Sequence, residues 1–132
     1  MLSTLLPLTT AVTLLATFTT AAPIAIDNGY TLRCNGESLS PTAEHTVILK
    51  LFALGATVDV YGSDSTHAQS YCDAGGCVYI SLRSYDGAFH RETAEAASQG
   101  AQAIYEACGT RGGSGPVIGD GQMVVHLSGN WI

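Results

Sequence analysis

The chain has 132 residues, of which 11 are acidic and 5 are basic, and its formal net charge at pH 7 is -6. This surplus of acidic side chains argues against nucleic acid or an anionic membrane as the natural partner, because both are bound by clustered Lys and Arg. Four cysteines in so short a chain are typical of a small secreted domain that is stabilised by disulfides.

Residues 1–22 are predicted to be a secretory signal peptide. They contain no charged side chain, and an apolar segment at 11–18 is followed by small residues that end at Ala21 and Ala22. The apolar segment is shorter than the roughly 20 residues that a membrane span needs, and threonines interrupt it. We therefore expect a secreted, extracellular protein with no membrane anchor after cleavage, in which residues 23–132 form a single domain.

The first predicted elements are a strand and a helix. Residues 30–34 are predicted to form a short strand that ends at the turn-forming pair Asn35-Gly36. A helix is predicted at 41–54, because Ser-Pro is typical of a helix start and apolar residues then recur at intervals of three and four. A strand remains the alternative for residues 46–52, since β-branched side chains are dense there.

The middle of the chain is predicted to form two strands. Residues 56–61 alternate between apolar and polar side chains, as a half-buried strand does. A polar connection is expected at 62–70. The turn between Cys72 and Cys77 then leads into a second alternating strand at 77–83, which forms the second arm of a long hairpin.

The last third is predicted to contain one helix and one strand. Residues 88–108 have mostly small side chains at helical spacing, so this helix can lie close against a sheet. The glycine-rich segment at 110–121 is interpreted as a flexible loop, because it lacks the G-K-[ST] ending of a phosphate-binding loop. The closing strand is predicted at 122–127.

The order of these elements predicts a fold of the α+β class. Strand, helix, strand, strand, helix, strand is typical of the split βαβ or ferredoxin-like two-layer sandwich, in which two helices cover one face of a four-stranded antiparallel sheet with strand order 4-1-3-2. The strand at 77–83 then lies between the first and second strands. All four cysteines arrive at one end of this fold, where two disulfides can form. The favoured pairs are Cys34 with Cys108 and Cys72 with Cys77, and the alternative pairs Cys34 with Cys77 and Cys72 with Cys108.

The face of the sheet away from the helices is the predicted binding surface. A polar and aromatic patch there could bind a sugar, a peptide or another protein. The alternative is a solvated sheet face with cross-strand charge pairs. The candidate binding residues are Arg33, Asp59, Tyr61, Tyr79, Arg83 and, in one of the two possible registers of the closing strand, His126.

No catalytic, metal or cofactor site is predicted. The four histidines are scattered over different elements, and no spacing brings two of them together. A small ribonuclease needs two histidines, or a histidine and a glutamate, beside an arginine on one sheet face. Arg33, Arg83 and His126 meet this requirement only loosely. We therefore do not expect an enzyme.

The second half of the mature chain resembles a known family. A strand after Cys77, a helix ending in Ala107-Cys108-Gly109, a variable loop and a closing strand introduced by Gly121-Gln122 resemble the killer toxins that virus-infected smut fungi secrete and related small secreted fungal proteins. The resemblance implies an α/β sandwich with disulfides, a toxin or host-directed effector role in virulence, and no catalytic site.

The sequence thus predicts a monomeric, secreted, non-enzymatic effector that binds a protein or glycan target of a host or competitor. An extracellular module that binds carbohydrate or cell wall is the alternative. A small secreted ribonuclease is a third possibility, which would depend on His126.

Overall fold

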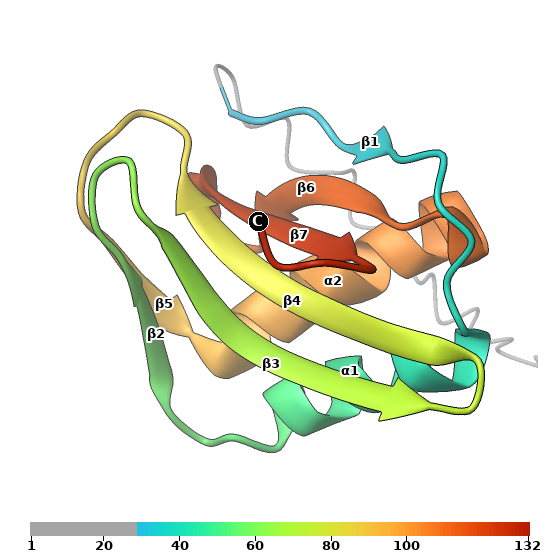
Figure 1. Ribbon diagram of the computed structural model, residues 1–132. Helices are drawn as coiled ribbons and strands as arrows, with labels where there is room; N and C mark the ends of the chain where they lie inside the picture. Colours follow the sequence, from blue (N-terminus) through green and yellow to red (C-terminus); the bar gives the residue numbers. More distant parts are fainter. Residues whose placement is uncertain (1–28) are drawn as a thin grey trace, which may run out of the picture.

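The computed structural model describes residues 29–132, so the predicted signal peptide at 1–22 lies outside the described residues. Two helices lie behind a five-stranded antiparallel sheet, and a two-stranded sheet stands at one side (Figure 1). The elements are β1 (Arg33–Cys34), α1 (Pro41–Phe52), β2 (Thr57–Val60), β3 (Ser65–Asp73), β4 (Gly76–Ser84), β5 (His90–Thr93), α2 (Ala94–Cys108), a 3-10 turn (Gly109–Arg111), β6 (Gly113–Val117) and β7 (Asp120–Ser128).

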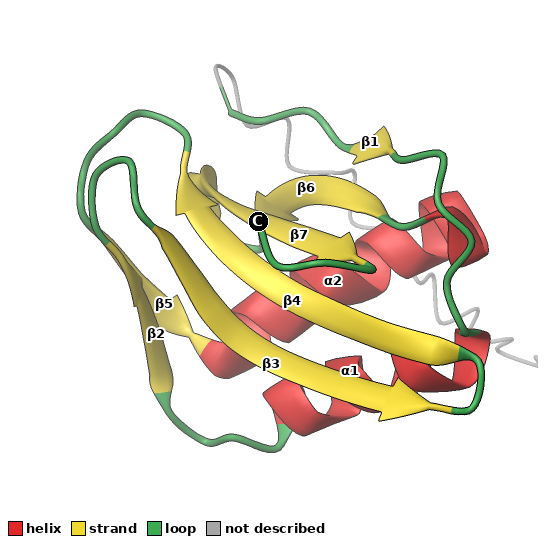
Figure 2. Cartoon of the chain, in the orientation of Figure 1, coloured by secondary structure: helices red, strands yellow, loops and turns green. Residues whose placement is uncertain are grey.

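Both helices cover the same face of the main sheet. Its strands lie in the order β1-β6-β7-β4-β3, and all neighbours are antiparallel. Helix α1 packs against β3 and β4, whereas α2 packs against β6 and β7, and the two helices contact each other. Figure 2 shows the opposite face of the sheet free of helices. This second face is called the open face below.

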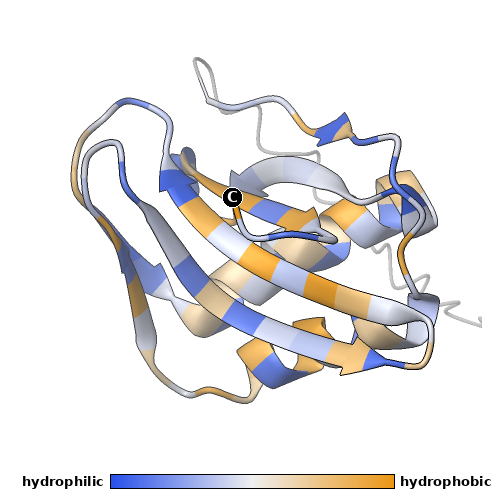
Figure 3. Cartoon of the chain, in the orientation of Figure 1, coloured by the Kyte–Doolittle hydropathy of each residue, from blue (hydrophilic) through white to orange (hydrophobic). Residues whose placement is uncertain are grey.

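The predicted strand at 77–83 is confirmed as β4. Val78, Ile80 and Leu82 are completely buried beneath the helices, and Arg83 is exposed on the open face. Apolar and more polar residues alternate along this strand in Figure 3. Because burying one such aliphatic side chain contributes about 1.5–3 kcal/mol, this inward row is a major part of the core.

Helix α1 begins where the sequence predicts, and residues 46–52 are helical, so the strand alternative is wrong. The Ser40 hydroxyl accepts a hydrogen bond from the Ala43 amide (3.2 Å) and donates one to the Asp73 carboxylate (2.6 Å). The helix ends at Phe52 rather than at residue 54, and Gly55 follows with a positive φ of 64°. The helix cap is therefore also a link to the turn between β3 and β4.

The predicted strand at 56–61 forms outside the main sheet. It is β2, and its only strand partner among the described residues is β5, which occupies part of the predicted helix at 88–108. Helix α2 begins only at Ala94, because the Thr93 side chain caps it by accepting a hydrogen bond from the Ala96 amide (3.0 Å). The helical spacing before residue 94 was therefore misleading.

Two segments that were expected to be loops form strands. Residues 65–70 of the predicted polar connection belong to β3, which pairs with β4 at the edge of the main sheet. Residues 113–117 of the predicted glycine-rich loop are β6, between β1 and β7. Glycine is needed here for close packing: a Cβ atom on Gly100 of α2 would lie 2.8 Å from the Pro116 carbonyl oxygen of β6.

The four-stranded sheet of the prediction is therefore wrong, because β6 and β3 bring the main sheet to five strands while β2 is outside it. The ferredoxin-like strand order 4-1-3-2 is not observed. Strand β4 lies between β7 and β3, not between the first and second predicted strands. The mixed α/β class, the antiparallel pairing and the two helices are confirmed.

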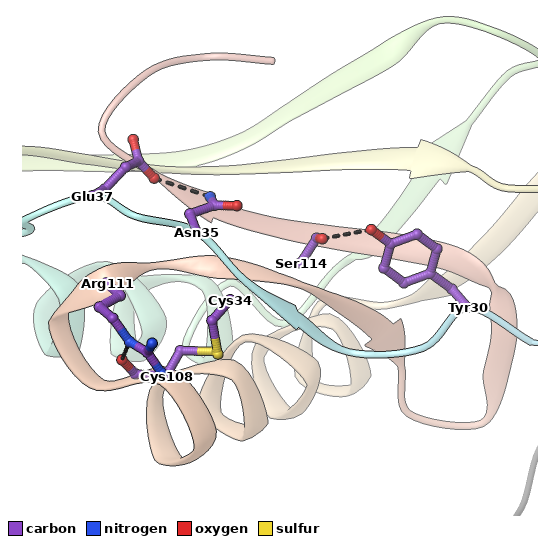
Figure 4. The surroundings of a disulfide bond; sticks show 7 residues. All are labelled: Tyr30, Cys34, Asn35, Glu37, Cys108, Arg111 and Ser114. Atoms are coloured by element: carbon purple, nitrogen blue, oxygen red, sulfur yellow. Dashed lines mark hydrogen bonds between the residues drawn. A yellow bond between two sulfur atoms is a disulfide. The ribbon is translucent and has the colours of Figure 1, made fainter.

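The favoured disulfide pairing is also confirmed. Cys34 is bonded to Cys108 across a Cα–Cα distance of 5.4 Å (Figure 4), and Cys72 is bonded to Cys77. The Leu39 amide donates to the Thr110 carbonyl close to the first disulfide, and the next residue along the chain, the helix cap, binds the turn of the second. Both disulfides therefore lie at the end of the molecule where α1 begins.

Candidate functional site

The open face carries a polar row that crosses all five strands. Cross-strand pairing places Arg33 beside Ser114, Ser114 beside His126, His126 beside Ser81, and Ser81 beside His67. Directly paired residues project from the same face of a sheet. Two of the predicted binding residues, Arg33 and His126, therefore lie in one row on the predicted surface.

A pocket of about 180 Å³ lies at one end of this face. Its lining consists of Tyr30, Arg83, Ser84, Tyr85, Val124 and His126, and we call it the open-face pocket. Arg83 is paired with Val124 in the sheet, so it stands diagonally across from His126. The pocket thus unites two predicted site residues with two tyrosines that the sequence analysis did not select.

The two tyrosines are held by the start of β7. The Tyr30 amide donates to the Gly121 carbonyl (2.9 Å), and the Tyr85 amide donates to the Gln122 carbonyl (2.7 Å). The two rings meet edge to face, with centroids 5.3 Å apart. These contacts join segments that are distant in sequence. Both tyrosines are nevertheless near strand ends in the sequence, since Tyr30 begins the predicted strand at 30–34 and Tyr85 directly follows β4.

Tyr30 also connects the pocket to the polar row. Its hydroxyl is hydrogen-bonded to the Ser114 hydroxyl (2.6 Å), as Figure 4 shows. The guanidinium carbon of Arg33 lies 5.6 Å from the centre of the Tyr30 ring, a distance at which a cation is attracted to an aromatic face. Arg33 does not line the pocket, but it stands next to a residue that does.

The pocket has a positive rim in an acidic molecule. Three of the five basic side chains donate to oxygen atoms elsewhere: Arg91 to Asp59, Lys50 to the Ser70 carbonyl and Arg111 to the Cys108 carbonyl. Within residues 29–132, Arg33 and Arg83 form no ion pair. The pocket lining contains no carboxylate. An anion approaching this part of the open face therefore meets guanidinium groups that no acid neutralises.

His126 is neutral at pH 7. Burial of the half-buried imidazole and, to a smaller extent, the positive charge of Arg83 together lower its pKa to about 4. A neutral imidazole offers one N–H donor and one acceptor nitrogen. The lining contains no second histidine or carboxylate that could exchange a proton with it. Arg83 and His126 thus come together as the ribonuclease hypothesis requires, but their acid-base partner is missing from the lining.

Tyr79 lies on the open face beneath the last residues of the chain. The Trp131 ring stacks on the His67 ring (centroids 4.1 Å apart) and is tilted against the Tyr79 ring (4.7 Å). The Ile132 amide donates to the Ser81 hydroxyl (3.3 Å). The last residues of the chain therefore fold back across the sheet (Figure 1), and the tryptophan among them is a feature of the sequence that could have indicated this contact.

Asp59 and Tyr61 lie elsewhere, on and just after β2. The Arg91 guanidinium binds both carboxylate oxygens of Asp59 (2.7 and 2.8 Å), and the Tyr61 hydroxyl donates to the same carboxylate (3.2 Å). The hydrogen bonds from Arg91 are the main reason why the pKa of Asp59 is below its usual value. Because β2 pairs with β5, these two candidate residues are not part of the open-face pocket.

His90 fixes the loop that carries Tyr85. Its Nε2 atom lies 2.7 Å from Asp86, and its Nδ1 atom lies 2.7 Å from Asp120 at the start of β7. Hydrogen bonds to two carboxylates require a proton on both ring nitrogens, and the carboxylates accordingly raise the pKa of His90, Asp86 most strongly. The same contact is the main cause that lowers the pKa of Asp86 to about 2.

No protein-family model, curated protein or solved structure matches the chain. Among the described residues, no three His, Cys, Asp or Glu side chains are grouped so that they could hold a metal ion. None of the helices in the same part of the chain has the length and apolar character that crossing a membrane requires.

Proposed function

We propose that this protein is a secreted, non-enzymatic binding protein that acts on a host or competitor cell as an effector or killer toxin-like protein. The observation that carries the proposal is the open-face pocket, where two tyrosine rings and Arg83, which forms no ion pair within the described residues, lie beside a neutral histidine. Two disulfides support secretion, because such bonds persist in oxidising compartments. The resemblance of residues 77–127 to killer toxins of smut fungi supports the effector role.

The composition of the pocket favours binding over catalysis. General acid-base catalysis at neutral pH needs a group whose pKa lies near the working pH. The pKa of His126 is about 4, and the lining offers no partner for it. Tyrosine and arginine, in contrast, are the residue types that contribute most to binding surfaces.

The proposal is tested by applying the purified mature protein to competitor fungal cells and to plant leaf tissue. We expect growth inhibition or a tissue response that Arg83→Gln and Tyr85→Ala abolish. Arg111→Gln is the matched control, because Arg111 does not line the pocket and the substitution removes the same charge. An unchanged response from both pocket variants would contradict the proposal, as would RNA cleavage that His126→Ala abolishes.

A carbohydrate or cell-wall binding module is the second candidate, and the tyrosine pair favours it. The rings of Tyr30 and Tyr85 border the pocket and could pack against a sugar ring. Retention on chitin, glucan and cellulose tests this candidate. Tyr85→Ala should abolish retention, whereas Tyr61→Ala should not, because Tyr61 lies outside the pocket.

A further inference from the structure

We infer that the open-face pocket binds a uronate unit of an acidic polysaccharide, with the sugar carboxylate at Arg83 and a second carboxylate of the same chain at Arg33. This inference rests on the proposed binding function and deepens it by naming the class of ligand. The charges, the size and the hydrogen-bonding groups of the pocket each support it.

The charges around the pocket favour a negatively charged ligand. The protein as a whole carries a net charge of -6, so an anionic ligand is repelled by most of its surface. At the pocket the sign is reversed, because Arg83 lines it and no carboxylate does. A guanidinium binds a carboxylate through two parallel hydrogen bonds, which gives this contact direction as well as strength.

The size of the pocket fits a single sugar ring. Its volume of about 180 Å³ is smaller than the roughly 300–1,000 Å³ of sites that enclose a drug-sized molecule. A single pyranose ring is of suitable size, and the rest of a polysaccharide chain would lie outside along the open face. The rings of Tyr30 and Tyr85 supply the aromatic surface that packs against the C–H face of a sugar.

The hydrogen-bonding groups of the pocket favour a ligand that carries hydroxyl groups. His126 is a neutral imidazole, with one donor and one acceptor, and it does not add a second positive charge. The Ser84 hydroxyl donates to Asp86 (2.9 Å), so its oxygen can still accept a hydrogen bond from a ligand. An ionised carboxylate such as acetate or an acidic side chain only accepts hydrogen bonds and would leave these acceptors without a partner. A sugar ring satisfies donors and acceptors together.

The positions of the two arginines point to a chain of uronates rather than to one unit. Arg33 is on β1 and Arg83 is on β4, three strands away in the order β1-β6-β7-β4. Strands are about 4.8 Å apart, so the two backbones are separated by about 14 Å, and each guanidinium group can meet a carboxylate of its own. A polyuronate carries a carboxylate on every sugar and can meet both.

The test is an NMR titration of the ¹⁵N-labelled mature protein with galacturonate, with a trimer of galacturonate, and with galactose, acetate and inorganic phosphate. We expect the amide signals of residues 83–85 and 124–126 to shift with galacturonate at a roughly millimolar dissociation constant. The trimer should bind more tightly. Galactose and acetate should each bind at least roughly tenfold more weakly than galacturonate, because each lacks half of the recognised groups.

Variants separate the two arginines. Arg83→Gln should weaken the binding of both galacturonate and its trimer roughly tenfold or more, whereas Arg33→Gln should weaken the binding of the trimer only. Arg111→Gln is the control and should change neither. If Arg83→Gln fails to fold, Arg83→Lys keeps the charge but loses the paired hydrogen bonds, and it should still weaken binding.

The inference is overturned if galacturonate causes no shifts at the pocket, if phosphate or acetate binds as tightly, or if Arg83→Gln has no effect. Equal binding of monomer and trimer would overturn the assignment of a second carboxylate to Arg33. If uronates fail but Arg83→Gln still abolishes the response of cells or leaf tissue, the ligand class is wrong and the proposed function stands. If Arg83→Gln also leaves that response unchanged, both the ligand class and the proposed function are wrong.

Discussion

Glu44 is a carboxylate that the fold buries completely. Within the described residues, neither of its side-chain oxygens has a hydrogen-bond partner. This burial raises the pKa of Glu44 to about 7. Since the folded pKa lies above the unfolded value of 4.5, the folded state favours the protonated acid. The associated stability is fully present below about pH 4.5 and is lost as the pH rises through 7.

We therefore expect Glu44→Gln to stabilise the protein at pH 8 and to change little at pH 4.5, because glutamine imitates the protonated acid. The gain should be about 3 kcal/mol at most, since one pKa unit corresponds to about 1.4 kcal/mol. Urea denaturation at the two pH values measures it. Glu106→Gln on the exposed side of α2 is the control. A gain of equal size at both pH values would show that charge burial is not its cause.

The loop between β4 and β5 depends on the protonated form of His90. Asp86 and Asp120 raise the pKa of His90, so the stability that this residue contributes is fully present below about pH 6.5 and is lost as the pH rises through the raised value. Above it, one of the two hydrogen bonds is lost and the carboxylates have no cation between them. Tyr85 is in this loop, so the shape of the open-face pocket depends on the same proton.

Amide hydrogen exchange can test this dependence. The Ala88 amide, which donates to Asp86 (2.9 Å), should become less protected at alkaline pH, beyond the general increase in chemical exchange rate. In His90→Asn this extra loss should be absent, because protection is already low at neutral pH. His45→Asn on the exposed side of α1 should behave like the wild type. Unchanged protection in His90→Asn would mean that the loop is held by other contacts.

The two disulfides restrain the chain to different degrees. Cys34 and Cys108 are separated by 74 positions, whereas Cys72 and Cys77 are separated by 5. In the chain-entropy model the first bond contributes about 4.5 kcal/mol and the second about 2 kcal/mol. We therefore expect paired Cys→Ser substitution at 34 and 108 to lower the urea midpoint more than substitution at 72 and 77. The reverse order would show that local strain or residual structure outweighs loop closure.

The elements that the sequence predicted well are those with a clear local pattern. Helix α1 has a capping serine, and β4 has an uninterrupted apolar alternation. Strand β3 has neither, because it is a half-buried edge strand with polar side chains. Strand β6 was hidden because its glycines serve the close approach of β1 and of Ile104 on α2, which are contacts between distant segments.

The residues of the candidate site also differ in how well the sequence predicted them. Arg83 and His126 were predictable because they occupy outward positions of well-patterned strands. Tyr30 and Tyr85 were missed because backbone contacts with the start of β7 bring them to the pocket, and no local spacing encodes these contacts. Asp59 and Tyr61 were placed on the open face wrongly, because alternation identifies a strand but does not say which sheet the strand joins.

At the scale of the whole molecule, His126 and Glu44 affect the pH dependence of stability in opposite directions. The pKa of His126 is about 4 in the folded state and 6.5 in the reference state, so the unfolded chain takes up a proton that the folded protein does not. The contribution of His126 is therefore present above about pH 6.5 and is lost as the pH falls toward 4. The contribution of Glu44 is lost as the pH rises from 4.5 to about 7.

Over the range that they share, the two contributions offset each other, and we expect the wild-type free energy of unfolding to vary little between pH 4.5 and 6.5. Glu44→Gln leaves the histidine alone, so its stability should fall on acidification. His126→Gln leaves the glutamate alone, so its stability should fall as the pH rises. In the double variant the free energy of unfolding should again vary little over this range, because the low pKa of Asp86 and the raised pKa of His90 affect stability outside it. Urea denaturation of all four proteins at intervals of half a pH unit measures these slopes, and slopes of the same sign in the two single variants would contradict the assignment of a buried acid and a buried neutral imidazole.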